Sequence, residues 1–190
     1  MEQHIIGIHS LWLPILLSSV AVFILSSILH MFTPWHKSDY SKIENQDKVM
    51  DAFRSMNLPA GDYAVPMPSS PQDMKSPEFT ERMMKGPLAV FTLRPGQPMS
   101  MSKNLIQWFL YSVVVGIFVA YVTGRIYTHG APYLQVFRLA GTTAFLSYSL
   151  ALAQFSIWYS RNWMTTFKSM FDGLVYAAAT AAVFAWLWPL

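Results

Sequence analysis

Four long stretches of this sequence are almost free of charged residues, and each is long enough to cross a lipid bilayer as a helix. A helix rises about 1.5 Å per residue, so a bilayer core of about 30 Å needs about 20 apolar residues. The stretches occupy residues 11–32, 104–124, 133–159 and 172–188. The sequence therefore predicts an all-α integral membrane protein with four transmembrane helices.

The fourth stretch is the shortest, and we expect its helix to begin at Asp172. Aspartate is a favoured N-cap residue, because its carboxylate accepts hydrogen bonds from the free backbone N–H groups of the first helical turn. On this interpretation the helix runs from the cap to the region of Trp188, close to the end of the sequence.

The composition agrees with a membrane protein and excludes several other classes. Hydrophobic residues make up 53% of the chain and charged residues only 12%, which is unlike an ordinary water-soluble domain. The sequence contains no cysteine, which excludes a disulfide scaffold and thiolate metal sites. The net charge is +3, but the basic residues are scattered among acidic ones, so we expect no nucleic-acid partner.

The basic residues near the span ends predict the orientation of the chain, because lysine and arginine gather on the cytoplasmic side of a membrane. One side carries Lys37, Lys42, Lys48, Arg94, Lys103, Arg161 and Lys168. The opposite side carries Arg125 alone, and residues 1–10 contain no lysine or arginine. We therefore expect both termini outside the cytoplasm, in a bacterial inner membrane.

Residues 33–103, between the first two spans, hold most of the charged residues and are expected to form a cytoplasmic insertion. Helical spacing of apolar residues predicts a short amphipathic helix over 44–56, and Ser76-Pro77-Glu78 predicts the start of a second. The β-prone segments 63–65 and 88–93 could pair as a small ribbon. We expect this segment to be a cap on the membrane surface or on a partner; the alternative is a partly disordered loop.

Small residues recur at every fourth position in two of the spans. In the second span they are Ser112, Gly116, Ala120 and Gly124, and in the fourth they are Ala177, Ala181 and Ala185. Such a ridge lets helix backbones approach closely in lipid. The ridges either hold spans two, three and four together or dock the protein onto another membrane protein.

Arg138 is the one basic residue inside a span, and polar residues follow it at helical spacing. Its side chain can snorkel to the outer surface, or it can join Thr142, Ser149 and Ser156 in a polar stripe that attracts an anion. His30 ends a weaker polar face on the first span. It either bonds locally within its helix or contacts a lipid headgroup or a partner.

The sequence contains no motif for a hydrolase triad, a phosphate-binding loop or a zinc site, so we expect a non-catalytic protein without a metal. No cofactor motif is present either; we expect bound lipid, and the sequence leaves haem and pigment open. Membrane lipids and other membrane subunits are the expected partners.

The leading hypothesis for function is an accessory, structural or assembly subunit of a larger membrane complex, which docks through its small-residue faces and its cytoplasmic cap. The alternative is a small transporter or channel component, as a homo-oligomer, with Arg138 selecting an anion. A lipid-modifying enzyme comes third, with His30, His36 and Asp39 as the acid/base set.

Overall fold

The computed structural model describes residues 5–98 and 100–190, so residues 1–4 of the predicted N-terminal segment lie outside the described part. The chain forms two compact units. The first combines the residues up to Ser41 with Ser100–Leu190, and the second begins at Lys42 and ends before Ser100. Each unit is described by itself below.

The first unit consists of helices long and apolar enough to span a membrane, as the sequence predicts. Its elements are η1 (Ile8–Leu11), α1 (Trp12–Ser27), the π-helical turn η2 (Ile28–Phe32), α4 (Met101–Ile126), α5 (Tyr133–Tyr148), η4 (Leu150–Leu152), α6 (Ala153–Tyr159) and α7 (Trp163–Trp186). Within the described residues they make four candidate membrane spans, over Ile8–Phe32, Met101–Ile126, Tyr133–Tyr159 and Trp163–Trp186. The length and composition of these four helices indicate a membrane protein.

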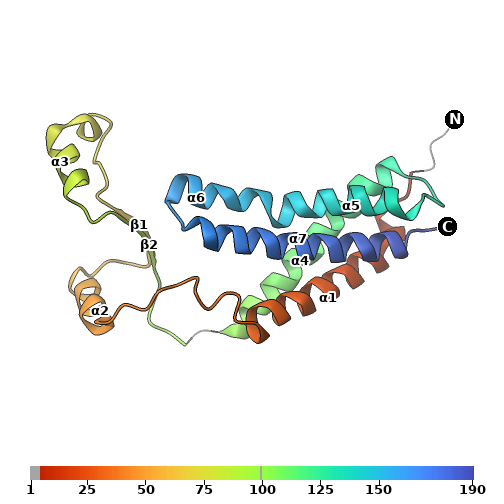
Figure 1. Ribbon diagram of the computed structural model, residues 1–190, viewed down its shortest axis with the longest axis horizontal. Helices are drawn as coiled ribbons and strands as arrows, with labels where there is room; N and C mark the ends of the chain where they lie inside the picture. Colours follow the sequence, from red (N-terminus) through yellow and green to blue (C-terminus); the bar gives the residue numbers. More distant parts are fainter. Residues whose placement is uncertain (1–4, 99) are drawn as a thin grey trace. The chain divides into compact units, whose positions relative to one another are not determined.

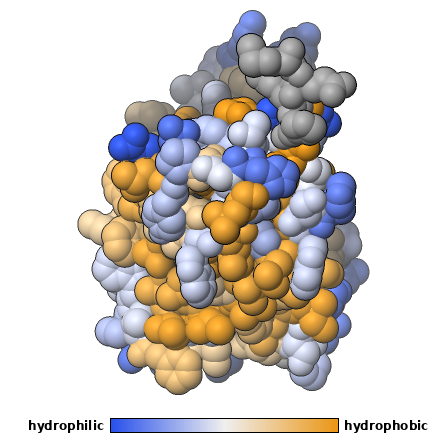
Figure 2. Space-filling model, turned by 90° about the vertical axis from the view of Figure 1, so that its right-hand side faces the viewer, coloured by the Kyte–Doolittle hydropathy of each residue, from blue (hydrophilic) through white to orange (hydrophobic). Residues whose placement is uncertain are grey.

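The spans pack as a bundle in the cyclic order α1, α4, α5, α7, so that α1 packs on both α4 and α7 (Figure 1). The core between them is formed by side chains such as Val22, Val119, Val136 and Phe184, each 0% exposed. Apolar side chains also cover much of the outer surface, as Figure 2 shows for the end at which the C-terminus lies. Outward-facing apolar side chains are what a lipid environment requires.

The fourth helix begins nine residues before the position that the sequence analysis assigned to it. The N-cap is Asn162, whose side-chain oxygen accepts a hydrogen bond from the Met164 backbone N–H at 2.8 Å, so the prediction of a cap at Asp172 is wrong. No glycine or proline interrupts residues 163–171, and the helix therefore continues through them. Asp172 lies inside α7, where it is 2% exposed.

The third span is broken where the sequence suggests one continuous helix. α5 ends at Tyr148, and Ser149 has φ −127° and ψ −57°, outside the helical region. The Ser149 hydroxyl donates a hydrogen bond to the Met170 carbonyl oxygen of α7 at 2.7 Å. At this level the backbone of Gly173 lies against Tyr148, because a Cβ on Gly173 would stand 2.9 Å from the Tyr148 carbonyl oxygen. The break therefore lies at a point where α7 approaches α5 closely.

The second unit contains the two short helices and the β-ribbon that the sequence predicts. Its elements are α2 (Gln46–Ser55), β1 (Gly61–Val65), η3 (Asp73–Lys75), α3 (Pro77–Lys85) and β2 (Ala89–Leu93). The strands are antiparallel and pair Gly61 with Leu93 and Val65 with Ala89. The Ser76 side chain caps α3 by accepting from the Phe79 N–H, as the sequence pattern indicates.

This second unit has a very small core. Among its described residues, Phe79 is the one apolar side chain that is fully buried, at 7% exposed. A further aromatic group joins α2 to the ribbon, with the Phe53 and Phe91 ring centroids 5.1 Å apart. A unit of this size with so little buried apolar surface is marginal by itself.

Candidate functional site

The small-residue ridges are buried inside the bundle. All seven of their residues are buried: Ser112, Gly116, Ala120, Gly124, Ala177, Ala181 and Ala185. The ridge of α4 lies against the first span, since a Cβ on Gly116 would stand 3.2 Å from the Ile15 Cγ2 atom. The α4 ridge at Gly116 thus faces the first span, which the sequence analysis left out of this packing. The α7 ridge faces α5, where the Ala181 Cβ lies 3.1 Å from a Cβ built on Gly141.

The polar stripe that was expected to follow Arg138 is divided by the break in the third span. Arg138 and Thr142 are exposed on α5, and the Thr142 hydroxyl donates to the Arg138 carbonyl oxygen at 2.8 Å. Ser149 and Ser156 are buried instead, and the Ser156 hydroxyl donates to Thr166 Oγ1 of α7 at 2.8 Å. The four side chains do not form one path, because the change of backbone direction at Ser149 rotates the later residues toward α7.

A cluster of ionisable side chains forms where the first span ends. η2 is followed by a turn in which the Lys37 N–H donates to the Pro34 carbonyl oxygen and the Asp39 N–H to that of His36. This turn folds the chain back, and the His36 ring stacks on the His30 ring with centroids 4.3 Å apart and planes at 14°. His30 and His36 thus lie together because the chain reverses immediately after η2.

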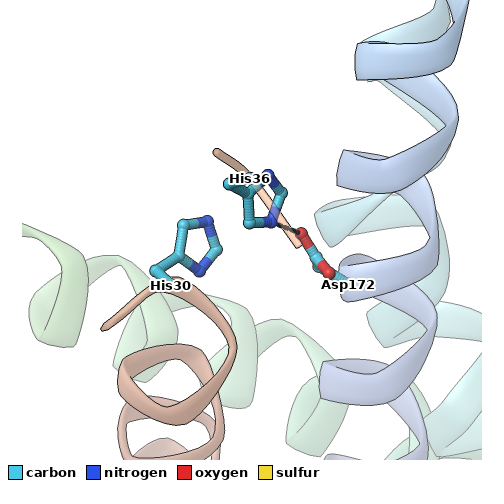
Figure 3. Close-up of side chains that lie close together, drawn as sticks. All are labelled: His30, His36 and Asp172. Atoms are coloured by element: carbon cyan, nitrogen blue, oxygen red, sulfur yellow. Dashed lines mark hydrogen bonds and ion pairs between the residues drawn. The ribbon is translucent and has the colours of Figure 1, made fainter. Parts of the chain in front are cut away.

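His36 joins this turn to the fourth helix. Its Nδ1 lies 2.6 Å from Asp39 Oδ2. Its Nε2 lies 2.7 Å from Asp172 Oδ2 (Figure 3). The three side chains are 15%, 9% and 3% exposed, so water screens them little. An ionised carboxylate only accepts hydrogen bonds, so each of these bonds needs a proton on the ring nitrogen that makes it.

Lys168 completes the cluster from one turn earlier on α7. Its Nζ donates to the Trp35 carbonyl oxygen and to Ser38 Oγ, each at 2.8 Å, and lies 3.2 Å from Asp39 Oδ1. Burial of Asp39 raises its pKa, but the hydrogen bonds and positive charges of His36 and Lys168 outweigh this effect and lower it below the ordinary 3.8. Asp39 is therefore a stable anion that holds the turn against α7.

Two buried polar atoms beside this cluster have no hydrogen-bond partner among the residues that the structure describes. They are Asp172 Oδ1 and the Tyr176 hydroxyl, on side chains of residues 2% and 4% exposed. A buried polar atom without a partner costs about 1–3 kcal/mol. An unpaired buried polar atom in a native protein has a structural reason, of which a bound water molecule or ion is one.

Asp172 and Tyr176 are among the residues that line a cavity of about 580 Å³ between the four spans. Its walls are mainly aromatic and apolar, and its polar lining comes from one turn of α1 and one face of α7. The lining residues are Ser26, Ser27, His30, Met31, Met101, Leu105, Trp108, Tyr111, Tyr148, Leu152, Ser169, Asp172 and Tyr176. Trp108 is fixed by a hydrogen bond from its Nε1 to Ser26 Oγ at 2.8 Å. The size is in the range of small-molecule sites, about 300–1,000 Å³.

The sequence analysis found part of this site and missed the rest. It grouped His30, His36 and Asp39, which the structure brings together, although Asp39 bonds to His36 and not to His30. It missed Asp172 because it assigned that residue to a helix end. A signal was present in the sequence: Lys168 and Asp172 are four apart and so share a face of any helix that begins before them.

Comparison with known proteins identifies no relative: no family model, no curated protein and no solved structure matches the chain.

Proposed function

We propose that this protein is a membrane-embedded binding protein, whose bundle holds a lipid-soluble amphiphile in the cavity between α1, α4, α5 and α7. The observation that carries the proposal is the cavity itself, of about 580 Å³ and lined from all four spans. Elsewhere the helices are in close contact through small residues, so the cavity is a local feature of the bundle.

The lining indicates the chemistry of the occupant. Trp108, Tyr111 and Tyr148 form a connected aromatic group, with neighbouring ring centroids 5.5–6.2 Å apart, which suits an apolar or ring-shaped body. The Tyr176 hydroxyl stands among them without a partner in the described structure and can bond to a polar head. A membrane lipid and a lipid-soluble ring compound share this chemistry.

Blocking the cavity is expected to remove the bound molecule. Leu105→Trp places a large ring on a half-buried cavity residue, whereas Ile106→Trp places the same ring on its neighbour, which is 61% exposed toward the outside. Native mass spectrometry of the full chain, extracted from its own membrane in mild detergent, should show at least about a tenfold loss of occupancy for Leu105→Trp and no change for Ile106→Trp. Solvent extraction and chromatography then identify the molecule.

A second variant tests the polar contact. Tyr176→Phe removes one hydrogen-bonding group and is expected to lower occupancy up to about tenfold, because a neutral hydrogen bond contributes about 0.5–1.5 kcal/mol. Tyr133→Phe, at a side chain 48% exposed on α5, is the matched control. Recovery of the wild-type chain with no bound molecule, or equal occupancy in Leu105→Trp and Ile106→Trp, would contradict the proposal.

The orientation proposed for this chain is that of a bacterial inner-membrane protein, with both termini outside the cytoplasm and residues 33–103 inside it. The sequence has no cysteine, so a single introduced cysteine is the one labelling site. A membrane-impermeant maleimide should label Ser69→Cys in inverted vesicles and not in intact cells, and should label Thr128→Cys in intact cells. Labelling of Ser69→Cys from outside the cell would reverse the orientation.

A second candidate function is that of an accessory or assembly subunit of a larger membrane complex. The second unit favours it, because Met50, Met56, Met67, Met84, Leu88 and Val90 are all more than half exposed there. Exposed apolar side chains on a unit with little core are typical of surfaces that a partner or a membrane covers. The ridges buried in the bundle no longer support docking. Co-purification with another polypeptide at fixed stoichiometry would support this candidate.

A transporter or channel in which Arg138 selects an anion has less support than either of these two functions. Arg138 is exposed on α5 and does not line the cavity. Ser149 and Ser156, which were expected to share its polar stripe, instead donate hydrogen bonds to α7.

A further inference from the structure

We propose that His30, His36 and Asp172 bind a divalent transition-metal ion, for which zinc is the best match, at the polar end of the bundle cavity. The inference goes beyond the proposed amphiphile site, because it rests on these three side chains and not on the occupant of the cavity. Three features support this site: the spacing of the side chains, the groups that orient them and a carboxylate oxygen without a partner among the described residues.

The three side chains come from separate elements and converge on one point (Figure 3). His30 lies on η2, His36 on the turn that follows it, and Asp172 on α7, and one possible ligand atom of each lies within 4.8 Å of the others. Zinc bonds of about 2.1 Å in a tetrahedral arrangement place ligand atoms about 3.4 Å apart. The separations of up to 4.8 Å, and the 2.7 Å between His36 Nε2 and Asp172 Oδ2, lie within about 1.5 Å of this spacing, so small movements of the side chains would close the site around an ion.

The His30 ring turns out of its parallel stack on His36 when an ion binds, because a ring nitrogen binds a metal in the plane of its own ring. His30 is exposed and can make this movement. His36 is held between two carboxylates and keeps its position, with Nε2 toward Asp172.

Both histidines have the outer hydrogen bonds that are typical of metal ligands. The Nδ1 of His30 lies 3.0 Å from the Ser26 carbonyl oxygen, and the Nδ1 of His36 lies 2.6 Å from Asp39 Oδ2. A proton on each Nδ1 satisfies these acceptors and leaves each Nε2 lone pair for an ion. Metal-binding histidines almost always donate their second ring N–H to a carbonyl or a carboxylate in this way.

The carboxylate of Asp172 is the independent observation that points to a bound cation. This residue is 2% exposed, and its Oδ1 has no hydrogen-bond partner within the described residues. A buried anionic oxygen without a donor is costly unless a cation or a ligand pairs with it. An ion bound here replaces the proton between His36 Nε2 and Asp172 Oδ2, and that proton leaves to water.

The donor set distinguishes among metals. Two imidazole nitrogens and one carboxylate suit zinc and related first-row ions, whereas calcium and magnesium prefer sites made of oxygen atoms. Three protein ligands leave a fourth position of a tetrahedral ion open for water.

Cobalt titration of the full chain tests the site. The protein, purified in mild detergent and treated with a chelator, is titrated with Co²⁺, whose visible absorption reports a low-symmetry nitrogen and oxygen site, and then with Zn²⁺. We expect one equivalent of Co²⁺ to bind and Zn²⁺ to displace it. His30→Ala and Asp172→Asn should each weaken binding at least about 100-fold, beyond the loss caused by removing an outer hydrogen bond.

The matched control is His129→Ala, an exposed histidine on the loop between α4 and α5, which should bind Co²⁺ like the wild type. His30→Ala keeps the test valid if Asp172→Asn unfolds, because His30 is exposed and its side chain makes one hydrogen bond and one ring contact in the described structure. Circular dichroism checks the fold of each variant. No Co²⁺ absorption in the wild type, or equal affinity in folded His30→Ala, would overturn the proposal.

Discussion

Replacing His36 by leucine is expected to destabilise the helical bundle by about 3–5 kcal/mol, the cost of removing one partner from a buried ion pair. His36 bonds to Asp39 and Asp172 at 2.6 and 2.7 Å, and their side chains are only 9% and 3% exposed. Without the ring, Asp39 keeps its contact with Lys168, but the buried Asp172 has no remaining donor among the described residues. Leucine fills the space of the imidazole ring. The loss of stability is therefore due to the missing contacts with the carboxylates and not to a cavity.

Tryptophan fluorescence during heating of the full chain in detergent measures this effect as a shift in Tm. His129→Leu, at an exposed histidine, is the control and should leave Tm unchanged. The double variant His36→Leu/Asp172→Leu removes the unpaired Asp172 carboxylate together with the ring. It should recover more than half of the Tm lost in His36→Leu. Equal Tm values for His36→Leu and His129→Leu would show that the cluster contributes little to stability.

Gly173→Ala is expected to destabilise the bundle by about 1–3 kcal/mol, the usual cost of overpacking. A Cβ at this position would stand 2.8 Å from the Ser149 Cβ and 2.9 Å from the Tyr148 carbonyl oxygen. A backbone atom cannot move aside as a side chain can, so α7 has to shift away from α5. The clash outweighs the gain in helix propensity, which is about 1 kcal/mol for alanine over glycine.

The control for this prediction is Gly96→Ala, because a Cβ on Gly96 meets nothing within 4 Å. Heating in detergent should show a lower Tm for Gly173→Ala and an unchanged Tm for Gly96→Ala. A Tm for Gly173→Ala at or above that of the wild type would mean that α5 and α7 are not packed as closely at this level as the structure describes.

The sequence by itself determined the architecture at the level of whole elements. Four apolar stretches gave four long helices, because burial of apolar side chains in lipid and helix length are both properties of a local stretch of chain. The Ser76 cap and the ribbon of β1 and β2 were also predictable, since capping and turn residues act on neighbours. The start of the fourth helix was missed because Asp172 is as suitable for a cap as Asn162 is.

Only the tertiary structure decided what the helices bring together. Hydropathy gives the length of a span but not its rotation about its own axis, so it cannot say that the ridge at Gly116 faces Ile15 of the first span. The bond between His36 and Asp172 joins residues 136 apart in the sequence. It exists because the chain reverses after η2 and α7 packs on α1, and these contacts depend on the fit of all four helices at once.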